Sequence, residues 1–314
     1  MPKSNRANYI DSAKELANIL DKSIQEILQE ANTLRIQYKQ NKVFTCGIIN
    51  AKSGFCSQDC AFCAQSVFHQ TNAQTYPLYN KQKIVEQALV MEDCGATNFS
   101  IVTSGLILSS QEMETICNAI IEIKQKTEMT ICISPGKITD QMAHQLIQSG
   151  VTNYHHNLET SKSFFKNICT THDYNVDIET IQLAKSNGLR VCCGGIMGLG
   201  ETWQHRIELA FLLKDLDVDS IPINFLNPIP GTRLEKQPLM SSSNALKCIA
   251  LFRLINPVKD IVVCGGREIT LKNEQSRIFS AGANGLMVGN YLTTPGQKIE
   301  KDFQMIQDLG LIVC

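Results

Sequence analysis

The chain has 314 residues, enough for two ordinary domains or for one large α/β barrel, which takes about 250 residues plus extensions. Apolar residues make up 43% and charged residues 19%, a composition that supports a buried core and argues against disorder. The formal net charge is −1 and the 29 basic residues are scattered, so neither a nucleic acid nor an anionic membrane is an expected partner.

The N-terminal residues are predicted to be helical. Apolar residues recur at spacings of three and four from Ile10 to Ile19 and again from Ile24 to Ala31, which indicates two amphipathic helices. The start is polar and lacks the apolar core of a signal peptide, and no apolar run approaches the ~18 residues of a membrane-spanning helix. We therefore expect a cytoplasmic protein with an N-terminal helical extension over residues 1–42.

Strand-like and helix-like segments alternate after this extension. Eight short apolar runs fit buried strands: VFTCGII, TNFSIVT, MTICIS, VTNYHH, RVCCGGI, DSIPINF, DIVVCGG and GLMVGN. Eight βα units without a Pro/Ser-rich linker favour an α/β fold of the (β/α)8 TIM-barrel type over residues 43–314. A dinucleotide-binding sheet is the alternative, prompted by GGIMGLGET, but the G-x-G-x-x-G spacing is absent.

Thirteen cysteines are present, an odd number that excludes complete disulfide pairing, and clustered thiols in a reducing compartment favour metal or redox chemistry. Five of them stand apart from any cluster, and we expect these to be structural: Cys94, Cys117, Cys169, Cys248 and Cys314. The stretch CGIINAKSGFCSQDCAFC holds four more, and its last three follow C-x3-C-x2-C.

Cys56, Cys60 and Cys63 form this loop directly after the first predicted strand, at the barrel face where catalytic groups collect. Structural zinc usually takes four protein ligands, and the bacterial ferredoxin run has a different spacing. Three thiolates on a four-iron cluster leave one iron open. The loop resembles that of the radical S-adenosylmethionine enzymes, which bind a [4Fe–4S] cluster chelated by S-adenosylmethionine. In that family an aromatic residue before the third cysteine contacts adenine, which implies this role for Phe62.

Further segments resemble the biotin synthase family within that superfamily, from about Cys46 to Gly310: SGFCSQDCAFCAQS, YHHNLETS, GGIMGLGET, PINFLNPIPGT, GGRE and AGANGLMVGNYLTT. The resemblance implies radical insertion of sulfur into dethiobiotin, a sulfurtransferase reaction that uses S-adenosylmethionine and forms biotin. Carbon–hydrogen bonds without an activating neighbour cannot be deprotonated by a side chain, so radical abstraction in a water-poor lumen fits this chemistry.

The resemblance also implies binding residues. Asn157 and Glu159 are expected near the ribose of S-adenosylmethionine and the substrate, and Asn224 near the ureido ring, although turn formation is the alternative for the asparagines. His155 shares the strand parity of Asn157 and is the better substrate candidate of the two tandem histidines, since only one can face the lumen. Gly198 and Gly200 are candidate cofactor contacts, with helix initiation as the alternative.

One position departs from the family pattern. Where many members carry a basic residue after a T-T-x-x-Y segment, TTHDYNVD carries Asp177. An anionic side chain cannot bind the carboxylate of S-adenosylmethionine, so no residue is assigned to this contact.

The sulfur donor in better-known members is an auxiliary [2Fe–2S] cluster held by three cysteines and an arginine. Cys132 and Cys192 match two of these ligands, whereas Ser100 and Val262 stand at the other two. Cys264 lies two residues beyond Val262 and shares its side of the strand. We hypothesise that Cys46, Cys132, Cys192 and Cys264 hold a different auxiliary cluster, of the four-iron type, while Cys193 faces away.

Two rival functions remain. One is another radical S-adenosylmethionine barrel enzyme that performs a rearrangement or matures a metallocofactor, and the other is a non-catalytic iron–sulfur or zinc module. The resemblance further implies a low-potential electron donor such as flavodoxin or ferredoxin, and a homodimer is possible because related enzymes form dimers.

Overall fold

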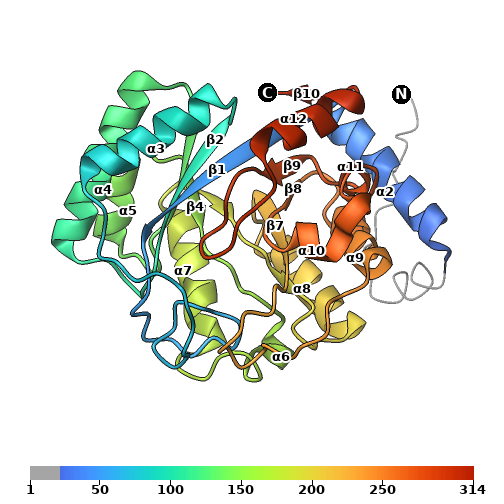
Figure 1. Cartoon of the computed structure of the whole chain (residues 1–314), viewed down its shortest axis with the longest axis horizontal. Helices are drawn as coiled ribbons and strands as arrows, with labels where there is room; N and C mark the ends of the chain where they lie inside the picture. The colour runs from blue at the N-terminus through green and yellow to red at the C-terminus, as the bar shows by residue number, and fades with distance from the viewer. Residues whose placement is uncertain (1–21) are drawn as a thin grey trace.

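The computed structural model describes residues 22–314, so the predicted helix over Ile10–Ile19 lies outside the described residues. Strands and helices alternate along the chain (Figure 1). The strands are β1 (Lys42–Lys52), β2 (Asn98–Thr103), β3 (Thr130–Ser134), β4 (Asn153–His155), β5 (Arg190–Cys192), β6 (Gly195–Met197), β7 (Ser220–Phe225), β8 (Asp260–Val263), β9 (Gly285–Met287) and β10 (Ile312–Val313).

The helices lie mainly outside the strands. They are α2 (Ile24–Lys39), α3 (Lys81–Asp93), α4 (Ser110–Lys126), α5 (Asp140–Ser149), α6 (Lys162–Phe165), α7 (Tyr174–Ser186), α8 (Trp203–Asp215), α9 (Ser242–Ile255), α10 (Arg267–Leu271), the 3-10 turn η1 (Lys272–Glu274), α11 (Arg277–Ser280) and α12 (Ile299–Asp308).

The parallel strands close into a barrel. They pair in the order β1, β2, β3, β4, β5, β7, β8 and β9, and β9 returns to β1, where Cys46 pairs with Met287. The fifth barrel strand is interrupted, because β5 pairs with β7 only at Cys192 and β6 continues the pairing from Gly195. Counting β5 and β6 as one barrel strand, all eight predicted strands are present, and the (β/α)8 prediction is confirmed.

Strand β1 shows how the sequence separates the lumen from the helix layer. Its buried residues alternate with partly accessible ones, and Phe44, Cys46 and Ile48 are the accessible residues that line an internal cavity. Residues of opposite parity, such as Val43 and Ile49, join the core beneath the helices. The period of two thus places every second residue of the strand in the lumen.

Local capping fixes the outer helices. In α4, Ser109 accepts a hydrogen bond from the Glu112 backbone while the Glu112 carboxylate accepts one from the Ser109 backbone, a capping box of the kind that contributes about 1 kcal/mol. The helix α2 starts with the same arrangement at Ser23 and Glu26. It packs against α9 on the outside of the barrel, and β10 pairs with the first residues of β1.

The connections after the strands gather at one face of the barrel. The long loop between β1 and α3 and the short helix α6 lie at the lower side of Figure 1, opposite the C-terminus. Loops after several strands supply polar side chains to the internal cavity, among them Gln58 and Gln65 after β1 and Asn157 and Glu159 after β4. The fold therefore brings the loops that follow the strands together above the lumen.

Candidate active site

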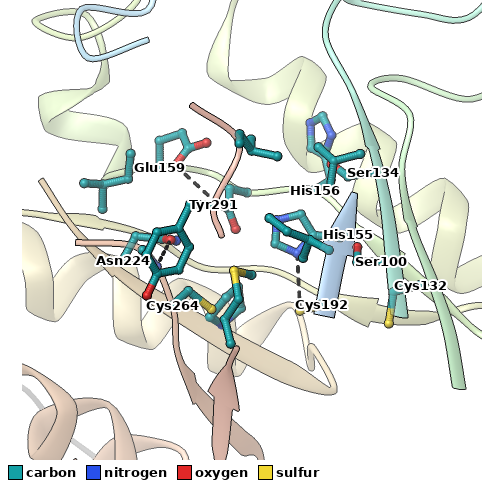
Figure 2. A pocket seen from close by; sticks show the side chains of 18 of the residues that line it. Ser100, Cys132, Ser134, His155, His156, Glu159, Cys192, Asn224, Cys264 and Tyr291 are labelled. Carbon is teal, nitrogen blue, oxygen red and sulfur yellow. Dashed lines mark hydrogen bonds between the residues drawn. The ribbon is translucent and has the colours of Figure 1, made fainter. Parts of the chain in front are cut away.

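A single cavity of about 760 Å³ occupies the lumen and opens between the loops after the strands. All seven cysteines that the sequence assigns to iron line it: Cys56, Cys60 and Cys63 from the loop after β1, and Cys46, Cys132, Cys192 and Cys264 from the strands. Figure 2 shows the sulfur atoms of Cys132, Cys192 and Cys264 among the side chains around this cavity. The fold therefore joins two groups of thiols in one space.

The three-cysteine loop is folded back on itself by backbone hydrogen bonds. The Cys56 amide donates to the Gln65 carbonyl at 3.1 Å, and the Val67 amide donates to the Cys56 carbonyl at 2.9 Å. Gly54 begins the turn with a φ of +81°, and a Cβ there would lie 2.3 Å from the Thr75 side chain. Glycine is therefore required where the chain turns towards the first cysteine.

Asp59, inside the loop, ties it to the segment after α6. Its carboxylate accepts hydrogen bonds from the Thr170 amide at 2.8 Å and the Thr170 hydroxyl at 2.6 Å. Burial disfavours ionisation of Asp59, but hydrogen bonds from Thr170 outweigh it, and the pKa of this carboxyl lies below its usual range. Arg233, from the segment between β7 and α9, donates to the backbone carbonyl of Asp59 at 2.8 Å. The loop is thus held from two other parts of the chain.

Cys169 lies beside this loop, contrary to the prediction that it stands alone. It lines the cavity beside Cys60, and the contact between the two thiols raises the pKa of Cys60 and lowers that of Cys169 to about 4. Its sulfur is also 3.3 Å from His172 Nδ1. The prediction failed because Cys60 and Cys169 are far apart in sequence, and contacts such as those of Asp59 with Thr170 and of the Ala61 amide with the Ile168 carbonyl form only when the two segments meet.

The four strand cysteines converge lower in the lumen. The Cys46 thiol lies close enough to Cys132 for the contact to raise its pKa, and the thiols of Cys192 and Cys264 raise it further. The Asn153 amide nitrogen lies 3.4 Å from Cys132 Sγ, and His155 Nδ1 lies 3.4 Å from Cys192 Sγ, as the dashed line in Figure 2 marks. A polar hydrogen of Asn153 therefore points at Cys132, and a ring nitrogen of His155 lies against Cys192.

Three of these thiols are held protonated in the protein alone. The contact with Cys132 and burial raise the pKa of Cys46, burial raises that of Cys192, and burial raises that of Cys264 to about 12, whereas the contact with Cys46 lowers the pKa of Cys132. Iron binding would release their protons and supply the counter-charge that four buried thiolates need. Four soft sulfur donors from separate strands suit an iron–sulfur cluster.

No three His, Cys, Asp or Glu side chains within residues 22–314 meet around a point that could hold one metal ion. In a four-iron cluster each thiolate binds a different iron, so its ligands need not share one point. The spread of both cysteine groups is compatible with clusters.

The positions where the auxiliary ligands of better-known members are missing also face the cavity. Ser100 pairs with Cys132 across β2 and β3 and lines the lumen, as does Val262. Cys264, two residues further, lines it too, which confirms the predicted parity. Cys193 instead lies in the core outside the lumen, also as predicted.

Three predicted binding residues, Asn157, Glu159 and Asn224, line the same cavity as the two cysteine groups. Asn157 donates to Glu159 at 3.4 Å and accepts from the Gly194 amide at 3.1 Å. Burial raises the pKa of Glu159 to about 8, and its backbone has a φ of 63°. Asn224 accepts from the Gly265 amide at 3.1 Å and donates to the Gly195 carbonyl at 3.4 Å, which leaves one amide hydrogen and one oxygen lone pair for a ligand.

Both tandem histidines line the cavity, so the prediction that only one can face it is wrong. Strand β4 ends at His155, so the alternation of side-chain direction along a strand no longer applies to His156. Burial lowers the pKa of His155 to about 4, which keeps it neutral beside Cys192. His156 instead contacts Asp177, the departure noted in the sequence, at 3.0 Å.

The remaining predicted cofactor contacts differ in placement. Phe62 lines the cavity and packs against a small apolar cluster that includes Ile168 and Leu226. Gly198 and Gly200 do not line it, although both have a positive φ, and the Gly198 amide donates to the buried Glu201 at 2.9 Å. The cofactor role of the two glycines stays a prediction, whereas their part in the turn before α8 is visible.

Some lining residues were missed from the sequence. Asn153 points at Cys132, and His172 contacts both Asp177 and the cysteine loop. Tyr291, after β9, lines the lumen and donates to Glu268 at 2.7 Å. Its place in GNYLTT, just past the eighth predicted strand, is the only signal that could have pointed to it.

Two family models match the chain. Residues 51–213 match the Radical SAM superfamily, and residues 222–312 match the Biotin and Thiamin Synthesis associated domain. A biotin synthase from Syntrophus aciditrophicus (strain SB) is 50% identical over 302 residues, covering 96% of this chain and 93% of that protein. A biotin synthase from Geobacter metallireducens is 53% identical over 284 residues, covering 90% of this chain and 86% of that protein.

The chain belongs to the biotin synthase family. Membership in this radical S-adenosylmethionine family implies a [4Fe–4S] cluster and S-adenosylmethionine as cofactors, and the three-cysteine loop supplies the donor set that such a cluster needs. No helix of the described residues is both long and apolar enough to cross a membrane.

Solved structures share the fold at low sequence identity. Methylornithine synthase (PylB) superposes with a TM-score of 0.84 at 18% identity and covers 98% of this chain and 95% of its own. The FeFe-hydrogenase maturase HydG from Carboxydothermus hydrogenoformans gives a TM-score of 0.80 at 13% identity, covering 93% of this chain and 73% of its own. At these identities the likeness concerns the barrel alone.

Proposed function

We propose that this protein catalyses the biotin synthase reaction, the S-adenosylmethionine-dependent insertion of sulfur into dethiobiotin that forms biotin. The observation that carries the proposal is the shared cavity, where a three-cysteine loop and four strand cysteines face one another. Dethiobiotin fits between the two groups because the reaction needs a radical source on one side and a sulfur source on the other.

The loop cysteines hold the catalytic cluster. Cys56, Cys60 and Cys63 would bind three irons of a [4Fe–4S] cluster and leave the fourth to S-adenosylmethionine. When bound, this group supplies the low-potential electron that cleaves S-adenosylmethionine and starts hydrogen abstraction. Asp59 and Arg233 restrain the loop that carries these ligands. Phe62, just before Cys63, presents an aromatic surface for adenine.

The wall between the cysteine groups binds and orients the organic ligands. Asn157 and Glu159 offer an amide and a carboxyl group to the ribose hydroxyls of S-adenosylmethionine and to the substrate. Asn224 can both donate to and accept from the ureido group of dethiobiotin. His155 stays neutral and is a further candidate for substrate contact. Closed packing of the barrel excludes water from the reacting carbons.

The strand cysteines hold the auxiliary cluster. Cys46, Cys132, Cys192 and Cys264 give four thiolate ligands, and a four-iron cluster with a sulfide to spare is the proposed sulfur donor. The convergence of these thiols and the absence of a ligand at Ser100 and Val262 support a ligand set different from three cysteines and an arginine.

The reaction also needs an electron donor and a reducing compartment. A low-potential carrier such as flavodoxin or ferredoxin would supply electrons, and a homodimer is the proposed assembly. A cytoplasmic location follows from the need to keep seven thiols reduced for iron.

An anaerobic assay tests the function. Reconstituted protein is incubated with dithionite, S-adenosylmethionine and dethiobiotin, and both 5′-deoxyadenosine and biotin are measured. We expect both products. Formation of 5′-deoxyadenosine without biotin, with dethiobiotin recovered unchanged, would favour another reaction of the radical S-adenosylmethionine superfamily. Colourless, zinc-containing protein with neither product would contradict the radical chemistry altogether.

A further inference from the structure

Asp177 bridges two imidazoles at the wall of the cavity. Its carboxylate oxygens each lie 3.0 Å from a ring nitrogen, Oδ1 from His156 Nε2 and Oδ2 from His172 Nε2. Asp177 is 5% exposed, and all three side chains line the cavity. The three residues come from the end of β4, the loop after α6 and the first turn of α7, so the fold assembles this group.

The group lies against the loop that carries the catalytic cysteines. His172 Nδ1 is 2.8 Å from Gln58 Oε1, and Gln58 lies between Cys56 and Cys60. The contacts of Asp59 with Thr170 and Thr171 hold the segment before His172 on the same loop. A ligand chelated at the open iron of a cluster on this loop would therefore meet this wall.

Such a ligand needs a positive partner for its carboxylate. Among the described residues that line the cavity, the basic side chains are Arg190 and the histidines 155, 156 and 172. Arg190 begins β5 at the opposite end of the barrel and faces Asp260 at 3.7 Å. His155 is neutral and faces Cys192. Only the pair around Asp177 remains near the loop.

His172 carries the positive charge beside Asp177. Its Nε2 faces Asp177, and its Nδ1 faces both Gln58 Oε1 and the Cys169 sulfur, so each ring nitrogen meets an acceptor that favours a proton there. The hydrogen bond to Asp177, together with the contact to Cys169, raises the pKa of His172 to about 10. Burial disfavours ionised Asp177, but hydrogen bonds from His156 and His172 outweigh it, and its pKa is lowered. The cation on His172 is shared between Asp177 and Cys169, whose own pKa is lowered to about 4, so these three groups leave no surplus positive charge and a further anion at this wall falls to His156.

His156 has one ring nitrogen to offer. Its Nε2 is engaged by Asp177, while no hydrogen bond joins its Nδ1 to any of residues 22–314. Its ring stacks against Tyr154 at a centroid distance of 6.1 Å, which fixes the direction of Nδ1. An imidazole between two carboxylates donates from both nitrogens as a cation.

We propose that His156 binds the aminoacyl carboxylate of S-adenosylmethionine through Nδ1 and that Asp177 and His172 position it. This inference rests on the proposed function, because it presumes S-adenosylmethionine on the three-cysteine loop. A basic residue at position 177 would contact the ligand carboxylate directly. Asp177 instead acts through His156, because its carboxylate orients the cationic imidazole and does not bind the ligand.

The test compares two ligands that differ only in that carboxylate. Dissociation constants for S-adenosylmethionine and for decarboxylated S-adenosylmethionine are measured by anaerobic equilibrium dialysis with reconstituted protein. We expect His156→Phe, which keeps a ring against Tyr154, to weaken S-adenosylmethionine binding by about 10- to 100-fold, as for a lost charge-assisted hydrogen bond. Affinity for the decarboxylated ligand should change by less than about threefold.

Three further variants separate charge from structure. His156→Lys, which restores a cationic donor, should recover much of the affinity for S-adenosylmethionine. Asp177→Asn should weaken the same ligand selectively, because it removes the group that orients His156. His144→Phe, at an exposed helix position whose ring contacts only the Asp140 carbonyl, serves as the matched control. Iron content and melting temperature confirm that each variant is folded and loaded.

The outcomes are distinct. Equal losses for both ligands, or unchanged S-adenosylmethionine affinity in His156→Phe, would overturn the carboxylate contact and leave the proposed function intact. Failure of the unaltered, iron-loaded protein to bind S-adenosylmethionine would overturn the proposed function itself.

Discussion

The thiols of Cys46 on β1 and Cys132 on β3 lie close enough to shift each other's pKa, although β2 lies between these strands. The contact is possible because the closed barrel turns both side chains inward, and because β2 presents only the small Ser100 beside Cys132. A bulky residue at this position of β2 would separate the two sulfurs. Cys46 is therefore part of the lower cysteine group and not of the loop group ten residues further on.

Cys46→Ser is expected to remove the auxiliary cluster and spare the catalytic one. Anaerobically reconstituted protein should contain about eight irons, and the variant about four, on the basis of two four-iron clusters. The variant should still cleave S-adenosylmethionine but form no biotin. Iron analysis and the two product assays measure these effects.

Two adjacent cysteines provide the matched control for this prediction. Cys192→Ser should behave like Cys46→Ser, whereas Cys193→Ser should keep the full iron content because Cys193 lies in the core outside the lumen. Iron near six in the unaltered protein would indicate a two-iron auxiliary cluster instead. An unaffected Cys46→Ser variant would exclude Cys46 as a ligand.

The strands and their inner faces could be predicted because they follow local rules. Alternation with a period of two placed Cys264 on the side of Val262 and turned Cys193 away from Cys192. The same rule failed at His156, because β4 is only three residues long and ends one residue earlier. Parity is informative only while a strand continues.

The contacts between loops could not be predicted, since they depend on the meeting of distant segments. Cys169 follows Cys60 by more than a hundred residues, and no periodic pattern links the two. Asp177 was recognised from the sequence as a departure, but its two histidine partners come from different connections of the barrel. Such a group becomes visible only once the barrel has closed.

Asp59→Ala is expected to loosen the catalytic loop. The variant loses the hydrogen bonds from Thr170 and Thr171, and each bond to a charged group contributes about 1.5–3 kcal/mol. The rate of iron release to a chelator should rise several-fold for the catalytic cluster, with little change for the auxiliary one. Spectroscopically resolved iron loss over time measures this difference.

Asp308→Ala is the control for this experiment, because Asp308 ends α12 far along the chain and bonds only Gln304. Equal iron release from Asp59→Ala and the unaltered protein would show that the loop does not depend on this carboxylate.

Asn224→Ala is expected to weaken dethiobiotin binding. Loss of a side-chain amide that pairs with a ureido group should raise the KM for dethiobiotin by about tenfold, or about 1.4 kcal/mol. The dissociation constant of S-adenosylmethionine should stay within about twofold of the unaltered value. Steady-state and binding measurements on the same preparation separate the two effects.

Asn224 also accepts from the Gly265 amide, so a structural role has to be distinguished. Asn224→Asp keeps this acceptor but cannot donate, and it should weaken dethiobiotin binding as well. A lowered melting temperature with an unchanged KM in both variants would assign Asn224 to the fold alone.

The pH dependence of S-adenosylmethionine binding is expected to reveal the role of Asp177. Its hydrogen bond, together with the contact to Cys169, raises the pKa of His172 to about 10, so His172 keeps its charge below that pH and loses it above. Affinity should therefore vary little through this group from about pH 6 to about pH 9.

In Asp177→Asn the pKa of His172 should fall towards its ordinary value, and affinity should decline as pH rises through that lower value. The other ionisable groups that face this site are Asp59, Glu159, Cys169 and His156, and they are common to both proteins, so the ratio of the two dissociation constants isolates the contribution of Asp177. A ratio that stays constant across this range would contradict the charge balance between His172 and Asp177.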